Sequence, residues 1–110
     1  MMLGRVQVPP SVRRGEVFEV RVIVQHPMET GFRRDMNGQA IAVHVVDKLA
    51  CRIAGREVFR AELGTGIAAN PYFSFHAVAE SSGPVEVEWS DDRGEKGSAS
   101  AMLEVIPAPD

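Results

Sequence analysis

The amino-acid sequence predicts an all-β protein, an immunoglobulin-like antiparallel β-sandwich of about seven strands. Apolar and polar residues alternate with a period of two through most of the chain, which is typical of strands with one buried face. Turn-forming residues separate these segments roughly every 8 to 12 residues, and helical periodicity never extends beyond a turn or two. The Cys…Trp…Cys pattern of antibody domains is absent, because Cys51 is the single cysteine.

The first half of the chain contains three predicted strands. Residues 3–8 form a short strand that Pro9-Pro10 ends. Residues 18–24 alternate phenylalanine and valine with charged or polar side chains, so one face is expected in the core. Residues 41–53 keep one apolar parity that Asp47 interrupts, and we expect a bend or a bulge there. The inward row of this third strand comprises Ile41, Val43, Val45, Leu49, Cys51 and Ile53.

Four further strands are predicted in the second half, with turn signals between them. The turns are Ala54-Gly55, Ser82-Gly83-Pro84 and the polar run 91–97, which is a predicted hairpin loop. Each intervening segment alternates apolar with polar residues, and the second of them is rich in aromatic residues. These strands comprise residues 59–63, 73–79, 85–89 and 99–105.

Length and composition are those of one globular domain covering residues 1–110. Apolar residues make up 45% of the chain and charged residues 25%. The net charge of −3 disfavours a nucleic-acid binder, which would normally show a basic stripe. No apolar run approaches the ~20 residues that cross a bilayer. We therefore expect neither nucleic acid nor membrane as a partner.

The N-terminus and the single cysteine bear on localisation. The chain begins without a basic segment followed by an apolar one, so no secretory signal is predicted. This favours the cytoplasm, unless the chain is exported with a partner or a leader has been removed. Cys51 cannot form an internal disulfide, which leaves the redox compartment open.

Five side chains are of the kind that ligate soft or borderline metals, namely His26, Met28, His44, Cys51 and His76. Cys51 shares the parity of core residues, whereas His44 and His76 have the opposite parity and are expected to face water. These ligands do not converge, so we predict no metal and no other cofactor. The string His26-Pro27-Met28 resembles the iron loop of superoxide reductases, but those sites need more histidines than the three present here.

No enzyme active site is predicted. Cys51 lies mid-strand in an apolar row, whereas a nucleophilic cysteine is exposed and has a basic neighbour. Ser81-Ser82 has no histidine or aspartate at a telling spacing, and Gly64-Thr65-Gly66 lacks the lysine and helix of a phosphate-binding loop. Glu86 and Glu88 share a strand face, which is typical of a charged outer surface.

Two loops remain unexplained by the fold alone. Residues 26–35 combine an imidazole, a thioether, two carboxylates and two guanidiniums, which an ordinary strand connection does not need. Residues 66–73 place Ile67, Tyr72 and Phe73 beside the Asn70-Pro71 step, which is expected to enter the next strand in an extended conformation. The first loop is either a self-neutralising salt-bridged turn or a docking patch. The second is either an end plug of the core or half of a protein interface.

Both loops resemble segments of a known family. Residues 24–35 read VQHPMETGFRRD and residues 66–75 read GIAANPYFSF, and these strings are similar to the two hallmark segments of SoxZ proteins. Residues 14–17 and the hairpin 55–61 resemble that family too, and the likeness extends from about Val6 to Val105. SoxZ is a subunit of the bacterial sulfur-oxidation carrier complex.

The resemblance implies a non-catalytic subunit of a SoxYZ complex, with no cofactor of its own. SoxZ proteins are immunoglobulin-like sandwiches that pair with SoxY, which carries the sulfur intermediates of thiosulfate oxidation on a cysteine in a flexible, glycine-rich C-terminal segment. Other Sox enzymes visit this complex transiently. It works in the periplasm, and SoxZ is thought to be exported with SoxY. That cysteine-bearing ending is absent here, and the resemblance assigns no carrier role to Cys51.

The two loops are therefore predicted to serve docking, either to SoxY or to the visiting enzymes. Two alternatives stay open, a stand-alone metal-binding redox protein on a β-sandwich and a generic adhesion domain. Exposed apolar sheet surface on a lone subunit could also drive homodimer formation. The candidate docking residues are His26, Met28, Glu29, Phe32, Arg33, Arg34, Asn70, Tyr72 and Phe73.

Overall fold

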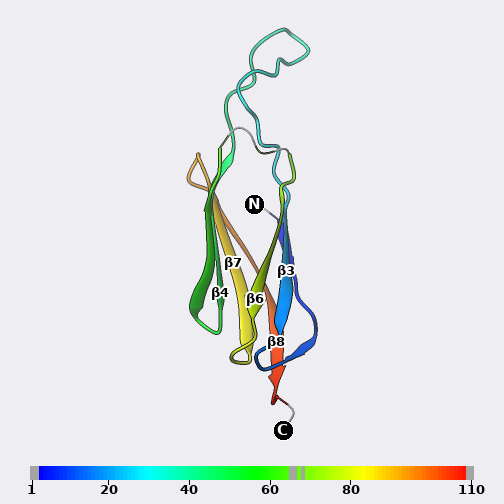
Figure 1. Ribbon diagram of the computed structural model, residues 1–110. Helices are drawn as coiled ribbons and strands as arrows, with labels where there is room; N and C mark the ends of the chain where they lie inside the picture. The colour runs from blue at the N-terminus through cyan, green and yellow to red at the C-terminus, as the bar shows by residue number, and fades with distance from the viewer. Residues whose placement is uncertain (1–2, 65–66, 68, 109–110) are drawn as a thin grey trace.

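The computed structural model describes residues 3–64, 67 and 69–108. Two β-sheets pack face to face, and no described residue is helical, which confirms the predicted all-β sandwich (Figure 1). One sheet has the strand order β1-β3-β6 and the other the order β2-β8-β7-β4-β5. The strands are β1 (Gly4–Gln7), β2 (Ser11–Arg13), β3 (Val17–Val24), β4 (Val46–Ile53), β5 (Arg56–Glu62), β6 (Tyr72–Val78), β7 (Gly83–Asp91) and β8 (Lys96–Ile106).

Seven of these strands correspond to predicted ones, and β2 does not. It is only three residues long, too short to show an alternating pattern, and it pairs with the end of β8 in parallel. All the other strand pairs are antiparallel, as predicted.

The core lies between the two sheets, where the predicted inward rows meet. Four apolar residues of β3 and three apolar residues of β7 are buried as the alternation predicts, and Trp89 is the largest fully buried side chain. Trp89 packs against Gly4 of β1 and Gly97 of β8, where a β-carbon would collide with the indole. The indole can therefore contact both sheets, because the two glycines beside it have no side chains in its way. The buried residues of these two rows are Phe18, Val20, Val22, Val24, Val85, Val87 and Trp89.

The predicted strand 41–53 is wrong in its first five residues. β4 begins only at Val46, and the pairing of β4 with β7 shifts register between Val46 and Lys48, which confirms the irregularity expected at Asp47. Ile41 and Val43 lie outside the core, and Val43 is 45% exposed. These residues do not join a sheet, because they belong to a return limb that bridges back to the preceding loop.

That loop is a two-limbed extension, residues 29–44, called the ribbon below. Its limbs are joined by isolated antiparallel bridges between Glu29 and His44 and between Arg34 and Ala40. Gly31 adopts φ 91°, and a β-carbon there would collide with Val43 of the opposite limb, so the narrow ribbon requires glycine. The ribbon projects beyond one end of the sheets (Figure 1), and the molecule measures 66 × 19 × 19 Å.

Within the described residues, no helix has the length and hydropathy that crossing a bilayer requires. Part of the predicted loop 66–73, and most of the Gly64-Thr65-Gly66 turn, lies outside the described residues, namely positions 65, 66 and 68.

Candidate functional site

Three polar side chains meet at the base of the ribbon, and we call them the anchor cluster: His26, His44 and Asp91. His26 follows β3, His44 precedes β4, and Asp91 ends β7. His44 Nε2 lies 2.7 Å from Asp91 Oδ2, His26 Nε2 lies 3.6 Å from the same oxygen, and the two imidazoles pack edge to face. The prediction that His44 faces water and that the histidines do not converge is wrong, because the ribbon turns the 41–45 segment back over the core.

The backbone around Met28 determines the tautomer of His26. The Met28 amide donates a hydrogen bond to His26 Nδ1 at 3.0 Å, so the neutral ring carries its proton on Nε2, facing Asp91. Met28 adopts φ 52°, an unfavourable conformation for a residue with a side chain. It is held there because its side chain is buried and its Sδ accepts a hydrogen bond from the Val46 amide.

Asp91 is the acceptor that unites the cluster. Its Oδ1 accepts hydrogen bonds from the Arg93 and Glu95 amides at 2.9 Å each, and its Oδ2 accepts one from His44. Burial acts to raise the pKa of Asp91, but these hydrogen bonds outweigh it and hold the pKa below the ordinary value. Burial, together with the neighbouring His44, lowers the pKa of His26. The cluster is therefore a carboxylate held between a neutral buried imidazole and a partly exposed one.

The two hallmark loops of the sequence touch one another. The His26 amide donates to Asn70 Oδ1 at 3.0 Å, and the Asn70 amide donates to the His26 carbonyl at 2.7 Å. Asn70 adopts φ 50°, so the extended entry predicted from its following proline is wrong. Asparagine tolerates this left-handed conformation, and the reciprocal hydrogen bonds with His26 stabilise it.

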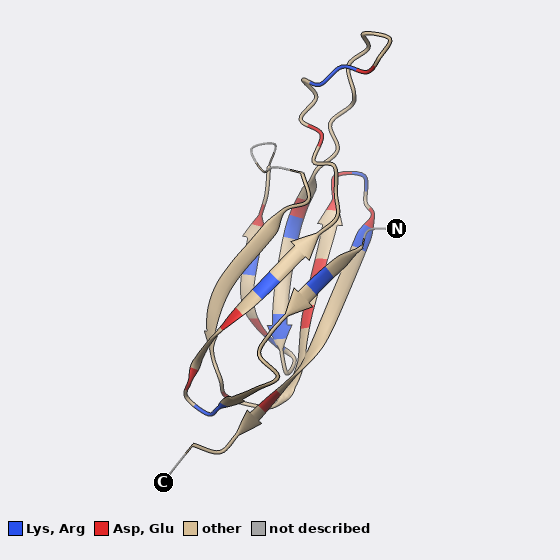
Figure 2. Cartoon of the chain, turned by 90° about the vertical axis from the view of Figure 1, so that its right-hand side faces the viewer, with Lys and Arg blue, Asp and Glu red and all other residues tan. Residues whose placement is uncertain are grey.

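The exposed surface of the ribbon combines charge with two bare apolar side chains. Arg33 contacts both carboxylate oxygens of Glu29 at 2.6 to 3.1 Å, and Arg34 donates to the Gly38 carbonyl at 2.8 Å. Figure 2 shows these basic and acidic segments on the projecting ribbon. Phe32 is 89% exposed and Met36 is 103% exposed, which is unusual for side chains of this size. The ribbon thus presents apolar contacts that the chain itself does not cover.

The predicted docking residues fall into three groups. His26 and Met28 are buried, so they support the ribbon and offer no surface of their own. Phe73 is half-buried and packs on the core from β6. The remaining six lie at least partly on the surface, while sequence reasoning missed Met36, His44 and Asp91. His44 and Asp91 can be identified only from a contact between residues far apart in the sequence. The surface members are Glu29, Phe32, Arg33, Arg34, Asn70 and Tyr72.

The anchor cluster has the composition of a metal site. Its three ligand atoms lie within 4.8 Å of one another, and His26 Nε2 has no hydrogen-bond partner among the described residues. Two imidazoles and a carboxylate suit a borderline divalent cation. However, a metal on Nε2 would require the proton on Nδ1, and the Met28 amide already points at that nitrogen. The hydrogen bonds therefore fit an anchor better than a metal centre.

The other chemical candidates lie in structural positions. Cys51 is fully buried, and burial raises the pKa of its thiol to about 11, so it is a poor nucleophile at neutral pH. Glu88 pairs with Arg52 across the sheet surface at 2.7 Å. Ser82 exchanges hydrogen bonds with the Val105 backbone, so its hydroxyl closes the end of the sandwich.

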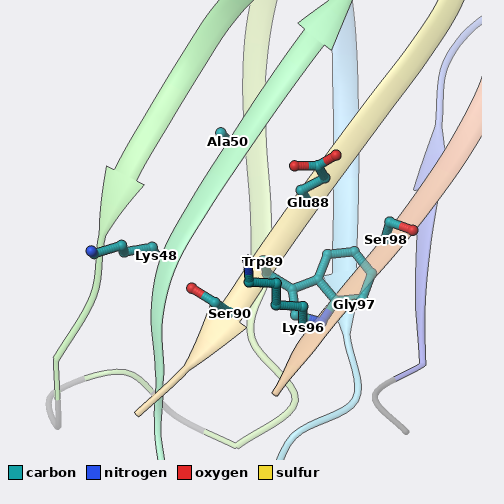
Figure 3. Close-up of a pocket in the computed structure, with 8 residues that line it drawn as sticks. All are labelled: Lys48, Ala50, Glu88, Trp89, Ser90, Lys96, Gly97 and Ser98. Carbon is teal, nitrogen blue, oxygen red and sulfur yellow. The ribbon is translucent and has the colours of Figure 1, made fainter. Parts of the chain in front are cut away.

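A surface depression on β4, β7 and β8 offers no built site either (Figure 3). Trp89 and Gly97 form its floor, and Lys48, Glu88 and Lys96 surround it with charges of both signs. The buried polar atom of its lining residues is the single donor Trp89 Nε1, so it lacks the several convergent polar groups of a ligand pocket.

Acidification is expected to destabilise the fold through His26. Because the folded pKa of His26 lies below its ordinary value of 6.5, the unfolded chain binds the proton first, and the free energy of unfolding falls as the pH drops from 7 towards 5. The carboxylates with lowered pKa values, such as Glu29, make the free energy of unfolding depend on pH only below about pH 4.5. Urea unfolding at pH 7 and pH 5 measures this difference. His26→Gln should reduce it while His76→Gln, at an exposed site, should not; equal pH dependence in all three proteins would contradict the assignment.

Solved structures show what this fold is similar to. A superoxide reductase (neelaredoxin) from Ignicoccus hospitalis aligns with a TM-score of 0.68 at 19% identity, covering 94% of this chain and 80% of that one. The sulfur carrier protein SoxY from Chlorobium limicola f thiosulfatophilum aligns with a TM-score of 0.64 at 12% identity, covering 94% and 78%. The CARDB domain of a Pyrococcus furiosus protein, in complex with di-metal ions, gives 0.59 at 13%, covering 98% and 94%. At these identities the matches show a shared fold.

The sequence itself places the chain in a family. No curated protein matches it. A family model described as sulphur oxidation protein SoxZ matches residues 6–102, which include both hallmark loops and the anchor cluster. The chain belongs to the SoxZ family of sulphur oxidation proteins.

Proposed function

We propose that this chain is the non-catalytic subunit of a SoxYZ-like sulfur carrier complex and pairs with SoxY. SoxY supplies the C-terminal cysteine that carries sulfur intermediates during thiosulfate oxidation, and this chain supplies docking surface. The observation that carries the proposal is the ribbon, an anchored projection with uncovered apolar side chains. The one thiol of the chain is buried in the core, which agrees with a role without covalent chemistry. The complex would work in the periplasm, with this chain exported together with SoxY.

The physical reason for such a subunit is that a carrier must visit several active sites. A flexible glycine-rich segment supplies reach but little binding surface. A rigid second domain adds specific surface and stabilises the base of the segment by association. The ribbon suits this task because Asp91 and the buried Met28 fix its base to the sandwich. Preorganisation of this kind lowers the entropy lost on docking.

The test removes the apolar contacts of the ribbon without touching its anchor. The double variant Phe32→Ser and Met36→Ser should lower thiosulfate-dependent turnover by a reconstituted Sox system about tenfold or more, as expected for hot-spot contacts. Both side chains are exposed, so the melting temperature should stay within about 2 °C of the parent value. Met102→Ser is the matched control, because Met102 is 69% exposed but lies on β8, away from the ribbon.

Measuring SoxY binding in the same variants distinguishes two forms of the proposal. Lost SoxY binding would place SoxY on the ribbon, and intact binding with lost turnover would place a visiting Sox enzyme there. Unchanged turnover in the double variant would contradict a docking role for the ribbon.

A metal-binding redox protein is the second candidate, and the anchor cluster is the observation that favours it. The tautomer of His26 argues against it, so we expect purified protein to bind neither zinc nor copper stoichiometrically. Elemental analysis after equilibration with each metal measures this directly. Stoichiometric metal that His44→Ala removes and His76→Ala retains would favour the second candidate, because His76 lies on β6 outside the cluster.

A further inference from the structure

The four strands at the sheet ends differ in how their free edges are protected. β1 and β2 are four and three residues long, too short to template a partner strand, and each carries an arginine. β5 bears four charged side chains, which commonly blunt an edge against pairing. The part of β8 that β2 does not cover lies beside β1. β6 differs from all of these, because its seven residues include no lysine, arginine, aspartate, glutamate or proline.

The backbone of β6 has unused hydrogen-bonding groups along its free edge. The Val24 amide donates to the Pro71 carbonyl, and the Ala79 amide donates to the Glu16 carbonyl. These two bonds determine which residues of β6 direct their backbone groups toward β3. Every second residue between these points bonds to β3, and the alternate ones direct both their N–H and C=O away from it. No backbone partner for these outward groups is found within the described part of the chain. The outward residues are Tyr72, Ser74, His76 and Val78.

An apolar seam runs beside this edge. The rings of Phe59 on β5 and Phe75 on β6 stack at 4.4 Å, so the two edge strands face each other on the same side of the sandwich. Phe59, Phe73 and Phe75 are only half-buried there. Tyr72 and Val78, at the two ends of β6, are each 55% exposed. An added strand would satisfy the backbone groups and cover this apolar surface together.

We propose that the free edge of β6 pairs, strand to strand, with an edge strand of SoxY. This inference rests on the function proposed above and names the surface where the two subunits meet. SoxY is the chosen occupant because its sandwich aligns with 94% of this chain at a TM-score of 0.64, so it shares this fold and ends its sheets in edge strands as well. Two sandwiches of one fold can join their sheets across such an edge. The ribbon then remains free for the enzymes that visit the complex.

Residue-resolved amide hydrogen exchange tests the pairing on the assembled complex with SoxY. In the isolated chain the amides of Ser74 and His76 should exchange rapidly and those of Phe73 and Phe75 slowly, because only the latter bond to β3. SoxY should slow exchange at Ser74 and His76 by about tenfold or more. Slowed exchange confined to other residues in a formed complex would overturn the inference and leave the proposed function standing. Failure to form any complex would overturn both.

Proline variants provide a matched pair of controls. His76→Pro removes one outward N–H of β6 and no bond to β3, so the fold should survive and SoxY affinity should fall about tenfold or more. Arg60→Pro makes the same change on the free edge of β5. The Leu63 amide donates to the Asp47 carbonyl, so alternate residues from Leu63 backwards bond to β4, and the amide of Arg60 points away from it. Its SoxY affinity should stay within about twofold of the parent value. Equal effects of the two variants on SoxY affinity would overturn the inference. It would also be overturned if amide protection of β6 rose with the concentration of this chain alone, because a second copy would then occupy the edge.

Discussion

Replacing Asp91 by alanine is expected to lower the free energy of unfolding by about 3–5 kcal/mol, because it removes a buried acceptor with several donors. The Arg93 and Glu95 amides and His44 Nε2 would all lose their partner, and His26 Nε2 would face an empty space. The loss would also free the ribbon, because His44 is its last residue and Asp91 ties that residue to β7. Urea unfolding at pH 7 measures the stability, and amide exchange in residues 40–45 reports the ribbon.

Glu95→Ala is the matched control for this substitution. Glu95 lies in the same hairpin and is exposed, and only its backbone bonds to Asp91: its amide donates to Asp91 Oδ1, and its carbonyl accepts from the Asp91 amide. Its replacement should change stability by less than about 0.5 kcal/mol. A loss below about 1 kcal/mol for Asp91→Ala would show that the anchor cluster does not hold the base of the ribbon.

Replacing Trp89 by alanine is expected to cost about 3–5 kcal/mol, since it removes the largest buried side chain between the two sheets. Gly4 and Gly97 flank the indole and have no side chains with which to fill the gap, so the surrounding structure cannot collapse well around it. The cavity would therefore remain large. Denaturant unfolding of the isolated chain measures the effect.

Trp89→Phe separates packing from polarity at the same position. The indole Nε1 has no hydrogen-bond partner among the described residues, so phenylalanine would remove a buried unsatisfied donor along with some volume. The loss of stability should stay below about 1.5 kcal/mol. If Trp89→Phe lost as much stability as Trp89→Ala, the indole nitrogen would have to make a stabilising contact beyond packing.

The sandwich was predictable because its strands carry strong local signals. The β3 and β7 rows alternate cleanly, and their burial follows that alternation residue by residue. The strand prediction failed at residues 41–44, because their alternation is equally clean but their partner is the other limb of the ribbon, whereas Val45 is buried as predicted. Periodicity indicates which side chains share a face, and it does not indicate what that face meets.

The anchor cluster was not predictable in this way, because its members are distant in the sequence. His44 and Asp91 are 47 positions apart, and no spacing rule connects them. The parity argument for His44 assumed a sheet strand that does not exist there. Asn70 failed for a related reason, since its hydrogen bonds with His26 outweigh the local preference of a residue before proline. Long-range polar contacts set the geometry of both loops.

We propose that this chain provides docking surface in a SoxYZ-like complex and holds no reacting sulfur itself. Intact-mass measurement of both subunits tests it most directly, after the assembled complex has been incubated with thiosulfate and the other Sox enzymes. We expect sulfur adducts on SoxY alone, with Cys51 unmodified in its buried site. A sulfur adduct on Cys51, or conversion of thiosulfate by this chain in isolation, would contradict it.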